Sequence, residues 1–388
     1  MIELDRALEI VSLAEPRVTV ETVSLAQALG RVLAQEIASP IDSPPFDKSA
    51  MDGFAVGAED DSEEFRVLET VAAGGTPTRE VRRGECARIM TGAMLPPGTG
   101  RVIRKELVEE KAGTVRPVRR EQSDNVIRRG ENLRAGETIL GPRVIAPRDI
   151  GILAASGVAT VPVAVPPLAG IVSTGSEIRP PGEPLGPGEI YNSNGPQLAA
   201  QLSALRCPSR FCGTAADEPG ALAAAVSEAL AGCDLVLLTG GVSEGDFDYV
   251  PQCLSDLGAE ILFHGVAIKP GKPTLFARRG DKYLFGLPGN PVSSFVVFEV
   301  LVKPFLYRRM GFEWTPSMQR GTLAERISRR STERTEFLPV RLREGRVWPV
   351  GYHGSAHVNA LGDADGLVRV EKGVGAVEKG TVIDVRPL

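Results

Sequence analysis

The spacing of apolar and polar positions divides the chain into stretches with different periods. Residues 4–14 carry apolar side chains at the three-and-four spacing that predicts a short amphipathic helix. Residues 23–29 predict a second helix, which Gly30 would end as a C-cap. The N-terminal segment is therefore expected to begin with two short helices.

From residue 65 to residue 167 the period changes to that of short strands. Val- and Ile-rich runs recur about every ten residues between glycines and prolines, which is typical of antiparallel β-structure. The clearest runs are Phe65–Leu68, Cys86–Met90, Arg101–Arg104 and Thr114–Val118. Residues 148–156 predict a return to a short helix.

Beyond Pro167 apolar strand-like runs alternate with Ala- and Leu-rich helical stretches. The predicted strands are Ala169–Thr174, Arg210–Cys212 and Asp234–Thr239, and the predicted helices are Gln197–Leu205 and Glu218–Leu230. This alternation indicates a mostly parallel sheet with helices on both faces. Ligands of such sheets bind outside the carboxyl ends of the strands.

The last stretch, residues 321–388, returns to short strands between Gly, Asp and Pro turns and predicts no helix. We therefore expect an α/β plus β multidomain protein. Its predicted parts are an N-terminal region at 1–165 with a β-rich insertion at about 60–140, a central α/β domain at 166–312, and a C-terminal β-barrel-like domain at 313–388.

Composition narrows the class of protein. A net charge of −5 argues against a general nucleic-acid surface. No apolar run is long enough for a transmembrane helix, and the first residues lack a signal-peptide pattern, so we expect a cytoplasmic protein. The five cysteines lack metal-ligand spacing and indicate reduced thiols. With three histidines, a histidine-dependent nucleophile scheme has little support.

The densest candidate chemistry follows the predicted strand that ends at Thr239. Gly240 and Gly241 allow the backbone to approach a ligand closely. The loop continues with Ser243, Asp246 and Asp248. Carboxylates beside such a turn suit Mg²⁺, which takes oxygen ligands and keeps several waters. Taken alone, two glycines after a strand are more often a simple turn.

Two further loops add anion-binding features. Lys269 and Lys272 flank a Pro-Gly turn and supply point charges for a phosphate or another oxyanion. Asn290 and Pro291 look like the N-cap and first residue of a helix, whose N-terminus attracts anions. Each loop alone could be a solvated bend or a plain cap, and the glycine-rich phosphate motifs are absent. Together they predict a Mg²⁺-assisted site for a phosphorylated or oxyanionic ligand.

Several acidic residues and glycines share a position relative to the predicted sheet. Glu177, Asp217, Gly240, Asp246 and Asp248 all come after predicted strands. Because the carboxyl ends of parallel strands meet at one edge, these residues are expected to line a common rim.

The motifs of this chain resemble those of a known family. They are Ser49–Ala55, Ile89–Ala93, Ser173–Glu177, Leu238–Ser243, Ala267–Pro273 and Gly286–Ser293. In this order they are similar to the molybdopterin molybdenumtransferases, the family of MoeA and of the gephyrin E domain. The resemblance runs from about residue 4 to the C-terminus.

The resemblance implies an activity in molybdenum-cofactor biosynthesis. Such an enzyme takes adenylyl-molybdopterin and molybdate, inserts the metal into the dithiolene and releases AMP with the help of Mg²⁺. It also implies a homodimer whose cleft the partner subunit completes, and substrate handover from a molybdopterin adenylyltransferase. No nucleic acid or membrane partner is implied.

The resemblance also implies roles for particular residues. Catalytic roles fall to Asp52, Thr91, Glu177, Asp217 and Asp248, and metal ligation to Asp246, Asp248 and Glu177. Contacts to molybdate or the pterin phosphate fall to Gly240, Gly241, Ser243, Lys269, Lys272, Asn290, Arg334 and Ser355. Molybdate is a tetrahedral dianion, so lysine, arginine, hydroxyl and N–H donors are the groups expected around it.

Three other readings stay open at this point. The chain could be the adenylyltransferase that makes the intermediate, since the central α/β domain is similar, although β-regions on both sides disfavour this. It could be a non-catalytic dimeric scaffold of the gephyrin E-domain type. Tungstate has the same shape and charge as molybdate, so the sequence leaves the choice between the two anions open.

Overall fold

The computed structural model describes residues 1–243 and 248–388, which form two compact units. The first unit comprises Met1–Glu21, Gly30–Ala34 and Pro162–Leu388, and the second comprises Thr22–Leu29 and Gln35–Val161. The division falls within strands β1 (Val20–Ser24) and β12 (Thr160–Ala164). Among the described residues no helix is long and apolar enough to cross a membrane.

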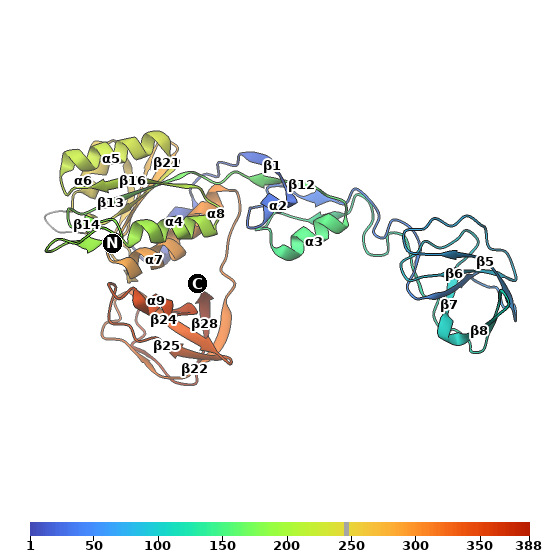
Figure 1. The fold of residues 1–388 in the computed structure, drawn as a ribbon. Coiled ribbons are helices and arrows are strands. Elements are labelled where there is room, and N and C mark those ends of the chain that lie inside the picture. Colours follow the sequence, from blue (N-terminus) through green and yellow to red (C-terminus); the bar gives the residue numbers. More distant parts are fainter. Residues whose placement is uncertain (244–247) are drawn as a thin grey trace. The chain divides into compact units, whose positions relative to one another are not determined.

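A six-stranded sheet forms the centre of the first unit (Figure 1). Its strands in spatial order are β16 (Ser209–Ala215), β13 (Ala169–Thr174), β17 (Leu235–Thr239), β21 (Lys282–Leu287), β20 (Leu275–Arg279) and β18 (Glu260–His264). The first four are parallel to one another, and β20 pairs antiparallel with both β21 and β18. The prediction of a mostly parallel sheet is therefore confirmed.

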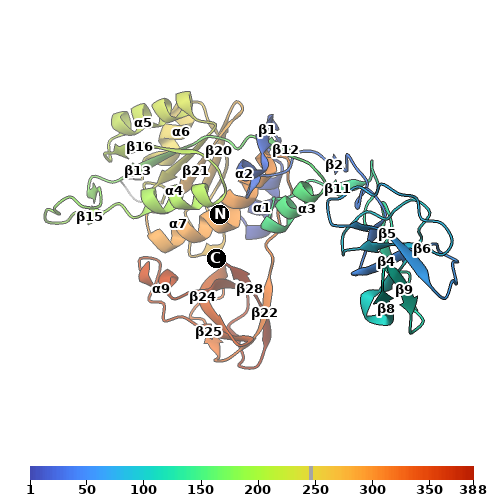
Figure 2. The same ribbon diagram turned by 45° about the vertical axis from the view of Figure 1, so that its right-hand side comes forward.

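Helices cover both faces of this sheet, as the alternating pattern predicts. Helices α5 (Pro219–Gly232) and α6 (Val250–Asp256) lie on one face, and α4 (Asn194–Ala204) and α7 (Pro291–Val297) lie on the other (Figures 1 and 2). Buried Leu222 and Val226 of α5 pack with Val236 and Leu238 of β17 in one apolar cluster.

The long apolar segment after Pro291 is not one helix. It contains α7, a π-helical turn at Phe298–Val302 and then α8 (Lys303–Arg309). Helix α1 (Leu4–Ser12), close to its predicted bounds, packs against α8. The N-terminal helix therefore belongs to the α/β unit.

The strand order creates a switch point beside β13. From β13 the chain goes through α4 to β16 on one side, and from β16 through α5 to β17 on the other. These two consecutive crossovers run in opposite directions across the sheet, which opens a crevice outside the carboxyl ends of β13 and β17. Thr174 and Thr239 end these strands, and the Thr174 hydroxyl donates to the Thr239 carbonyl at 3.1 Å.

The C-terminal strands close into a barrel, as the predicted β-barrel-like domain requires. They are β22 (Gln319–Leu323), β24 (Thr335–Arg343), β25 (Arg346–Pro349), β26 (Gly366–Val370) and β28 (Val382–Pro387). Closure follows because β24 pairs with both β25 and β26, and the remaining pairings complete the ring. Buried Val340, Val347, Val368 and Val385 fill the interior.

Shorter elements accompany the barrel. Strands β23 (Ile327–Ser328) and β27 (Ala376–Val377) pair with each other, and β19 (Ile268–Lys269) pairs in parallel with β24. The expectation of no helix after residue 321 is wrong at one turn, α9 (Asn359–Gly362). Its four residues are too few to show a helical period.

The second unit contains another six-stranded sheet. Its order is β7 (Arg101–Arg104), β4 (Gly53–Val56), β6 (Glu85–Ile89), β5 (Phe65–Val71), β9 (Thr114–Pro117) and β8 (Val108–Lys111). Buried Phe54 and Phe65 lie in one of its apolar clusters. The remaining elements are β2 (Ile37–Ala38) paired with β11 (Thr138–Leu140), β3 (Lys48–Ser49) paired with β10 (Val126–Ile127), α2 (Leu25–Ala28), α3 (Pro147–Ala155) and a 3-10 turn at Lys105–Leu107. Helix α2 is shorter than the helix predicted at 23–29, because the first two residues of that prediction, Val23 and Ser24, belong to β1.

Candidate functional site

An acidic cavity of about 680 Å³ lies at the switch point of the central sheet. The ends of β13 and β17 contribute Thr174 and Thr239 to its wall. Its carboxylates come from the loops that follow β13, β16 and β17, namely Glu177, Asp217 and Asp248. Gly240, Gly241 and Ser243 also line it. The rim predicted from strand ends is thus assembled in one cavity, except that Asp246 lies outside the described residues.

Backbone geometry explains the two glycines in this wall. Gly240 has φ of 90° and Gly241 has φ of 63°, values that glycine adopts without strain. A Cβ on Gly240 would lie 2.7 Å from the Thr174 hydroxyl oxygen and 2.9 Å from the Thr174 carbonyl oxygen. Only glycine therefore lets the loop after β17 pass this close to the end of β13.

The loop after β13 is tied to the loop after β16. The Ser176 backbone N–H donates to an Asp217 carboxylate oxygen at 3.0 Å, and the Asp217 backbone N–H donates to the Ser176 hydroxyl oxygen at 3.4 Å. This reciprocal pair fixes one carboxylate of the acidic cavity by backbone contacts.

A cationic cavity, also of about 680 Å³, adjoins the acidic one. Its positive side chains include Lys269, Lys272, Arg330 and Arg334. Ser293, Ser355 and Tyr352 add hydroxyl groups to the lining. Burial raises the pKa of Tyr352 to about 12, with a smaller contribution from Glu336, so its phenol stays protonated at neutral pH.

The two cavities have three residues in common. Pro273, Pro288 and Asn290 line both of them. Asn290 occupies the N-cap position of α7, as predicted, but its side chain makes no capping hydrogen bond. The amide group is therefore available between an acidic and a cationic compartment.

One residue that the sequence did not single out organises the cationic cavity. Glu336 faces Lys269 in the β19–β24 ladder, and its carboxylate accepts from the Lys269 ammonium at 2.8 Å and from the Arg329 guanidinium at 2.8 Å. Glu336 is the second residue of β24 and lies two positions after Arg334, which precedes the strand, so its closeness to the predicted Arg334 is the only signal in the sequence that could have indicated it. Arg334 in turn donates to the Ile268 carbonyl at 3.3 Å.

Asp52 and Thr91 belong to the second unit and contact each other there. Asp52 Oδ1 accepts from the Thr91 backbone N–H and from the Thr91 hydroxyl, both at 2.8 Å, and Oδ2 lies 3.2 Å from Lys105 Nζ. These contacts, led by the Thr91 N–H, lower the pKa of Asp52 to about 2. The carboxylate is therefore ionised at any physiological pH.

The donor set for a metal can be tested directly. Within residues 1–243 and 248–388 no three acidic, histidine or cysteine side chains come together as a metal site. The acidic cavity nevertheless offers carboxylate oxygens, which suit Mg²⁺ when phosphate and water complete its coordination. The five cysteines are free thiols.

Comparison with known proteins gives consistent matches along the chain. Residues 2–157 match the MoeA N-terminal region (domain I and II), residues 170–308 a probable molybdopterin binding domain, and residues 320–388 the MoeA C-terminal region (domain IV). Molybdopterin molybdenumtransferase from Bacillus subtilis (strain 168) is 35% identical over 402 residues, covering 99% of this chain and 93% of that protein. The Staphylococcus aureus (strain Mu50) protein of the same name is 34% identical, covering 94% and 90%.

Solved structures agree with these matches. A molybdopterin biosynthesis MoeA protein from Pyrococcus horikoshii aligns with a TM-score of 0.88 at 28% identity, covering 100% of both chains. A second structure of that name from the same organism aligns with a TM-score of 0.84 at 34% identity, covering 100% of this chain and 99% of that one. Sequence and fold thus agree over the full length, and the chain belongs to the MoeA family of molybdopterin molybdenumtransferases.

Proposed function

We propose that this protein inserts molybdate into adenylyl-molybdopterin and releases AMP, giving the molybdenum cofactor. The observation that carries the proposal is the pair of adjoining cavities of opposite charge, which share Pro273, Pro288 and Asn290. The substrates require this division. An oxyanion needs cationic groups and N–H donors around it. A phosphoric anhydride bond, in contrast, breaks most readily where the negative charge that develops on the leaving phosphate is neutralised.

In this scheme the cationic cavity holds molybdate. Lys269, Lys272 and Arg334 supply positive charge, and Ser355 supplies a hydroxyl donor. Glu336 keeps the Lys269 ammonium at the wall through the 2.8 Å ion pair. Holding the oxyanion beside the dithiolene makes metal transfer effectively intramolecular, which removes much of the entropic cost of the step.

The acidic cavity receives the anhydride end of the substrate. Glu177, Asp217 and Asp248, with Asp246 from the neighbouring segment, are the carboxylates that would hold Mg²⁺ together with substrate phosphate oxygens. Bound Mg²⁺ would neutralise charge on the leaving phosphate. Gly240, Gly241 and Ser243 would bring backbone and hydroxyl groups close to the same phosphate.

The remaining features of the scheme rest on the family resemblance. They are a cytoplasmic homodimer whose cleft is completed by the partner subunit, catalytic roles for Asp52 and Thr91, and substrate handover from a molybdopterin adenylyltransferase. The ionised Asp52 carboxylate is compatible with a role near a metal or a cationic group.

The decisive experiment measures molybdate-dependent AMP release from adenylyl-molybdopterin with Mg²⁺ present. Lys272→Ala and Asp248→Ala should each lower the rate by about a hundredfold or more, since each removes a charge from the lining of a cavity assigned to the substrates. Lys379→Ala and Asp384→Ala, exposed in the barrel region, are the matched controls and should keep the parental rate. Full turnover in both cavity variants would overturn the proposal. ATP-dependent adenylylation of molybdopterin would favour the adenylyltransferase instead.

A further inference from the structure

The outer face of one barrel hairpin carries an unusual combination of side chains. Strands β24 and β25 are joined by Glu344 and Gly345, whose φ values of 50° and 72° are those of a tight type I′ turn. Leu342 and Val347 of the hairpin pack against the barrel interior. Because side chains alternate along a strand, the positions between them point outward. These are Arg341, Arg343, Arg346 and Trp348, called here the Arg–Trp face.

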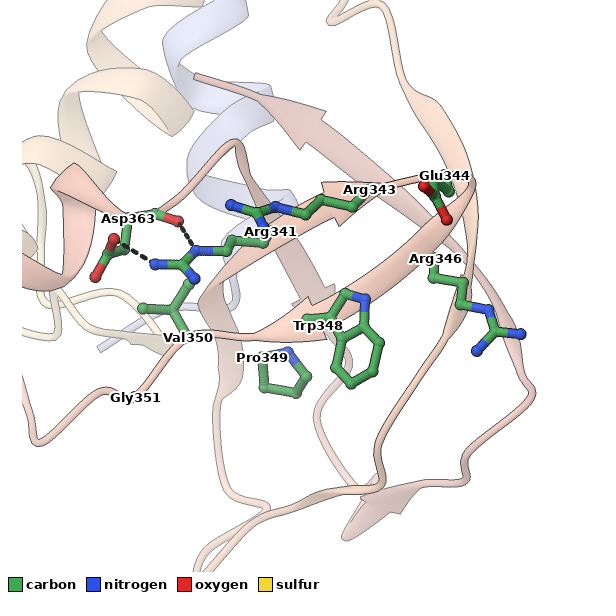
Figure 3. Close-up of a pocket in the computed structure, with 9 residues that line it drawn as sticks. All are labelled: Arg341, Arg343, Glu344, Arg346, Trp348, Pro349, Val350, Gly351 and Asp363. Carbon is green, nitrogen blue, oxygen red and sulfur yellow. Dashed lines mark hydrogen bonds and ion pairs between the residues drawn. The ribbon is translucent and has the colours of Figure 1, made fainter.

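The pairing register on this face is electrostatically unfavourable. Arg343 lies directly opposite Arg346, and like charges at directly opposed positions of an antiparallel pair repel each other. Within the described part of the chain neither guanidinium has an ion pair or hydrogen bond, nor does the Glu344 carboxylate. Arg341, in contrast, is held by the Asp363 carboxylate and donates to the Asp363 carbonyl at 2.9 Å (Figure 3). Two guanidinium groups are thus left with unused donors.

Trp348 adds exposed aromatic surface to these charges. The chain has only two tryptophans. Trp314 is stacked on Tyr307 and lies beneath the cations of Lys303 and Arg386. Trp348 is 37% exposed and, in the described residues, contacts no other ring or cation. One of two tryptophans is therefore exposed among three arginines.

These side chains surround a surface hollow of about 830 Å³, larger than either cavity of the proposed active site. Figure 3 shows Pro349 beside the Trp348 ring, with the Arg343 and Arg346 side chains extending away from each other on the two strands. Both edges of β25 are already paired, with β24 and with β22. A partner strand therefore cannot extend the sheet here, so recognition has to use the side chains.

The geometry points to the Arg–Trp face as a docking site for an acidic segment of a partner protein. Carboxylates of the segment pair with the Arg343 and Arg346 guanidinium groups, which match a carboxylate bidentately. An apolar side chain of the segment packs on the Trp348 indole. Tryptophan and arginine are the residues that most often dominate binding energy at protein interfaces.

A nucleic acid fits this face less well. Among the described residues only two guanidinium groups of this face are unpaired, whereas tight binding to a phosphate backbone comes from many simultaneous contacts. Glu344 and Asp363 also line the hollow and would repel a run of phosphates. The net charge of −5 gives no long-range attraction for a polyanion.

The test uses the full-length protein and three probes: a glutamate-rich peptide with one leucine and one proline, the same peptide with lysine for glutamate, and single-stranded oligothymidylate. Binding is followed by fluorescence anisotropy of the labelled probe. The acidic peptide should bind, and Trp348→Ala and the double variant Arg343→Glu/Arg346→Glu should each weaken binding by about tenfold or more. Arg326→Glu, exposed in the same barrel outside the hollow, is the matched control and should bind as the parent does.

Molybdate-dependent AMP release should be unchanged in the variants, since neither Trp348 nor the two arginines line the acidic or cationic cavity. This separates failure of the docking site from failure of the proposed activity. The inference is overturned if the acidic peptide does not bind, if the Arg–Trp variants bind as tightly as the parent, or if the lysine peptide or oligothymidylate binds better.

Discussion

Glu336 holds two cations of the cationic cavity, Lys269 and Arg329, through its carboxylate. Its side chain is 5% exposed, and that of its partner Arg329 is 1% exposed. Arg329 also donates to the Glu371 carbonyl at 2.7 Å and the Val374 carbonyl at 3.0 Å. The pair is thus a buried ion pair with its remaining donors satisfied, and Lys269 is attached to it from the cavity side.

We expect Glu336→Ala to lower the free energy of unfolding by about 3–5 kcal/mol, because it leaves the Arg329 charge buried without a counter-charge. Adding Arg329→Ala should then cost less than Arg329→Ala costs alone, with a coupling of about 1–3 kcal/mol. Urea unfolding of the four proteins measures this. The exposed pair Arg326–Glu378 in the same barrel is the control, and its coupling should stay below about 1 kcal/mol. Additive losses for the buried pair would contradict the ion-pair account.

The Asp52 carboxylate gives a prediction about pH. Its pKa lies at about 2, below the usual 3.8, because the Thr91 N–H, the Thr91 hydroxyl and Lys105 stabilise the ionised form. A depressed pKa contributes stability that is present above the unfolded pKa and is lost as the pH falls through about 2. Thr91→Val removes the hydroxyl donor and keeps the N–H, so the pKa should rise only part of the way to its usual value. Carbon-13 NMR titration of the carboxyl group measures the change, and an unchanged pKa would contradict the assigned cause.

At the scale of elements, the loop after β17 depends on Gly240. Gly240→Ala places a Cβ 2.9 Å from the Thr174 carbonyl oxygen at a φ of 90°. Strain and clash together should cost about 2–3 kcal/mol of stability and displace the wall of the acidic cavity. Gly258→Ala is the control, since Gly258 has φ of 74° but no atom within 4 Å of the added Cβ, so only backbone strain of about 1 kcal/mol applies. Urea unfolding measures the free energy of unfolding of both variants. Equal losses of stability would contradict the prediction, because they would mean that the contact with Thr174 is relieved by a small shift of the loop.

Local pattern predicts these elements well where one face is buried and the period is clean. Strand β13 and helix α5 fall at or close to their predicted bounds because each buries a continuous apolar set. Pattern fails where the deciding contacts are distant along the chain. The barrel closes through the pairing of β24 with β26, and Lys269 meets Glu336 only through the β19–β24 register.

The candidate site divides in the same way. Strand ends predicted the acidic rim because parallel strands share one edge, so Glu177, Asp217 and Asp248 could be placed in one cavity from local sequence alone. The cationic cavity needs two separate parts of the chain. Lys272 comes from a loop of the central domain and Tyr352 from the barrel, and no local period relates them.

At the scale of the whole molecule, the two compact units provide a way to locate anion binding. Each unit has its own apolar clusters, so each should unfold as a cooperative body. Both tryptophans, Trp314 and Trp348, belong to the first unit, which also contains the cationic cavity. Tryptophan fluorescence therefore reports unfolding of the first unit, whereas calorimetry reports both units.

We expect molybdate to raise the midpoint temperature of the unfolding transition that tryptophan fluorescence detects. A second transition, seen only by calorimetry, should keep its midpoint temperature. A ligand that binds only the native state at one hundred times its Kd adds about 2.7 kcal/mol to the stability of the part that binds it. Lys272→Ala should abolish the shift, because the anion then lacks one of its charged contacts, whereas Lys379→Ala should preserve it. If molybdate shifts the calorimetric transition without moving the fluorescence midpoint, the anion binds in the second unit and the cationic cavity is not its site. If both probes follow a single transition, the units unfold together, and the Lys272→Ala comparison alone then decides whether the cavity binds the anion.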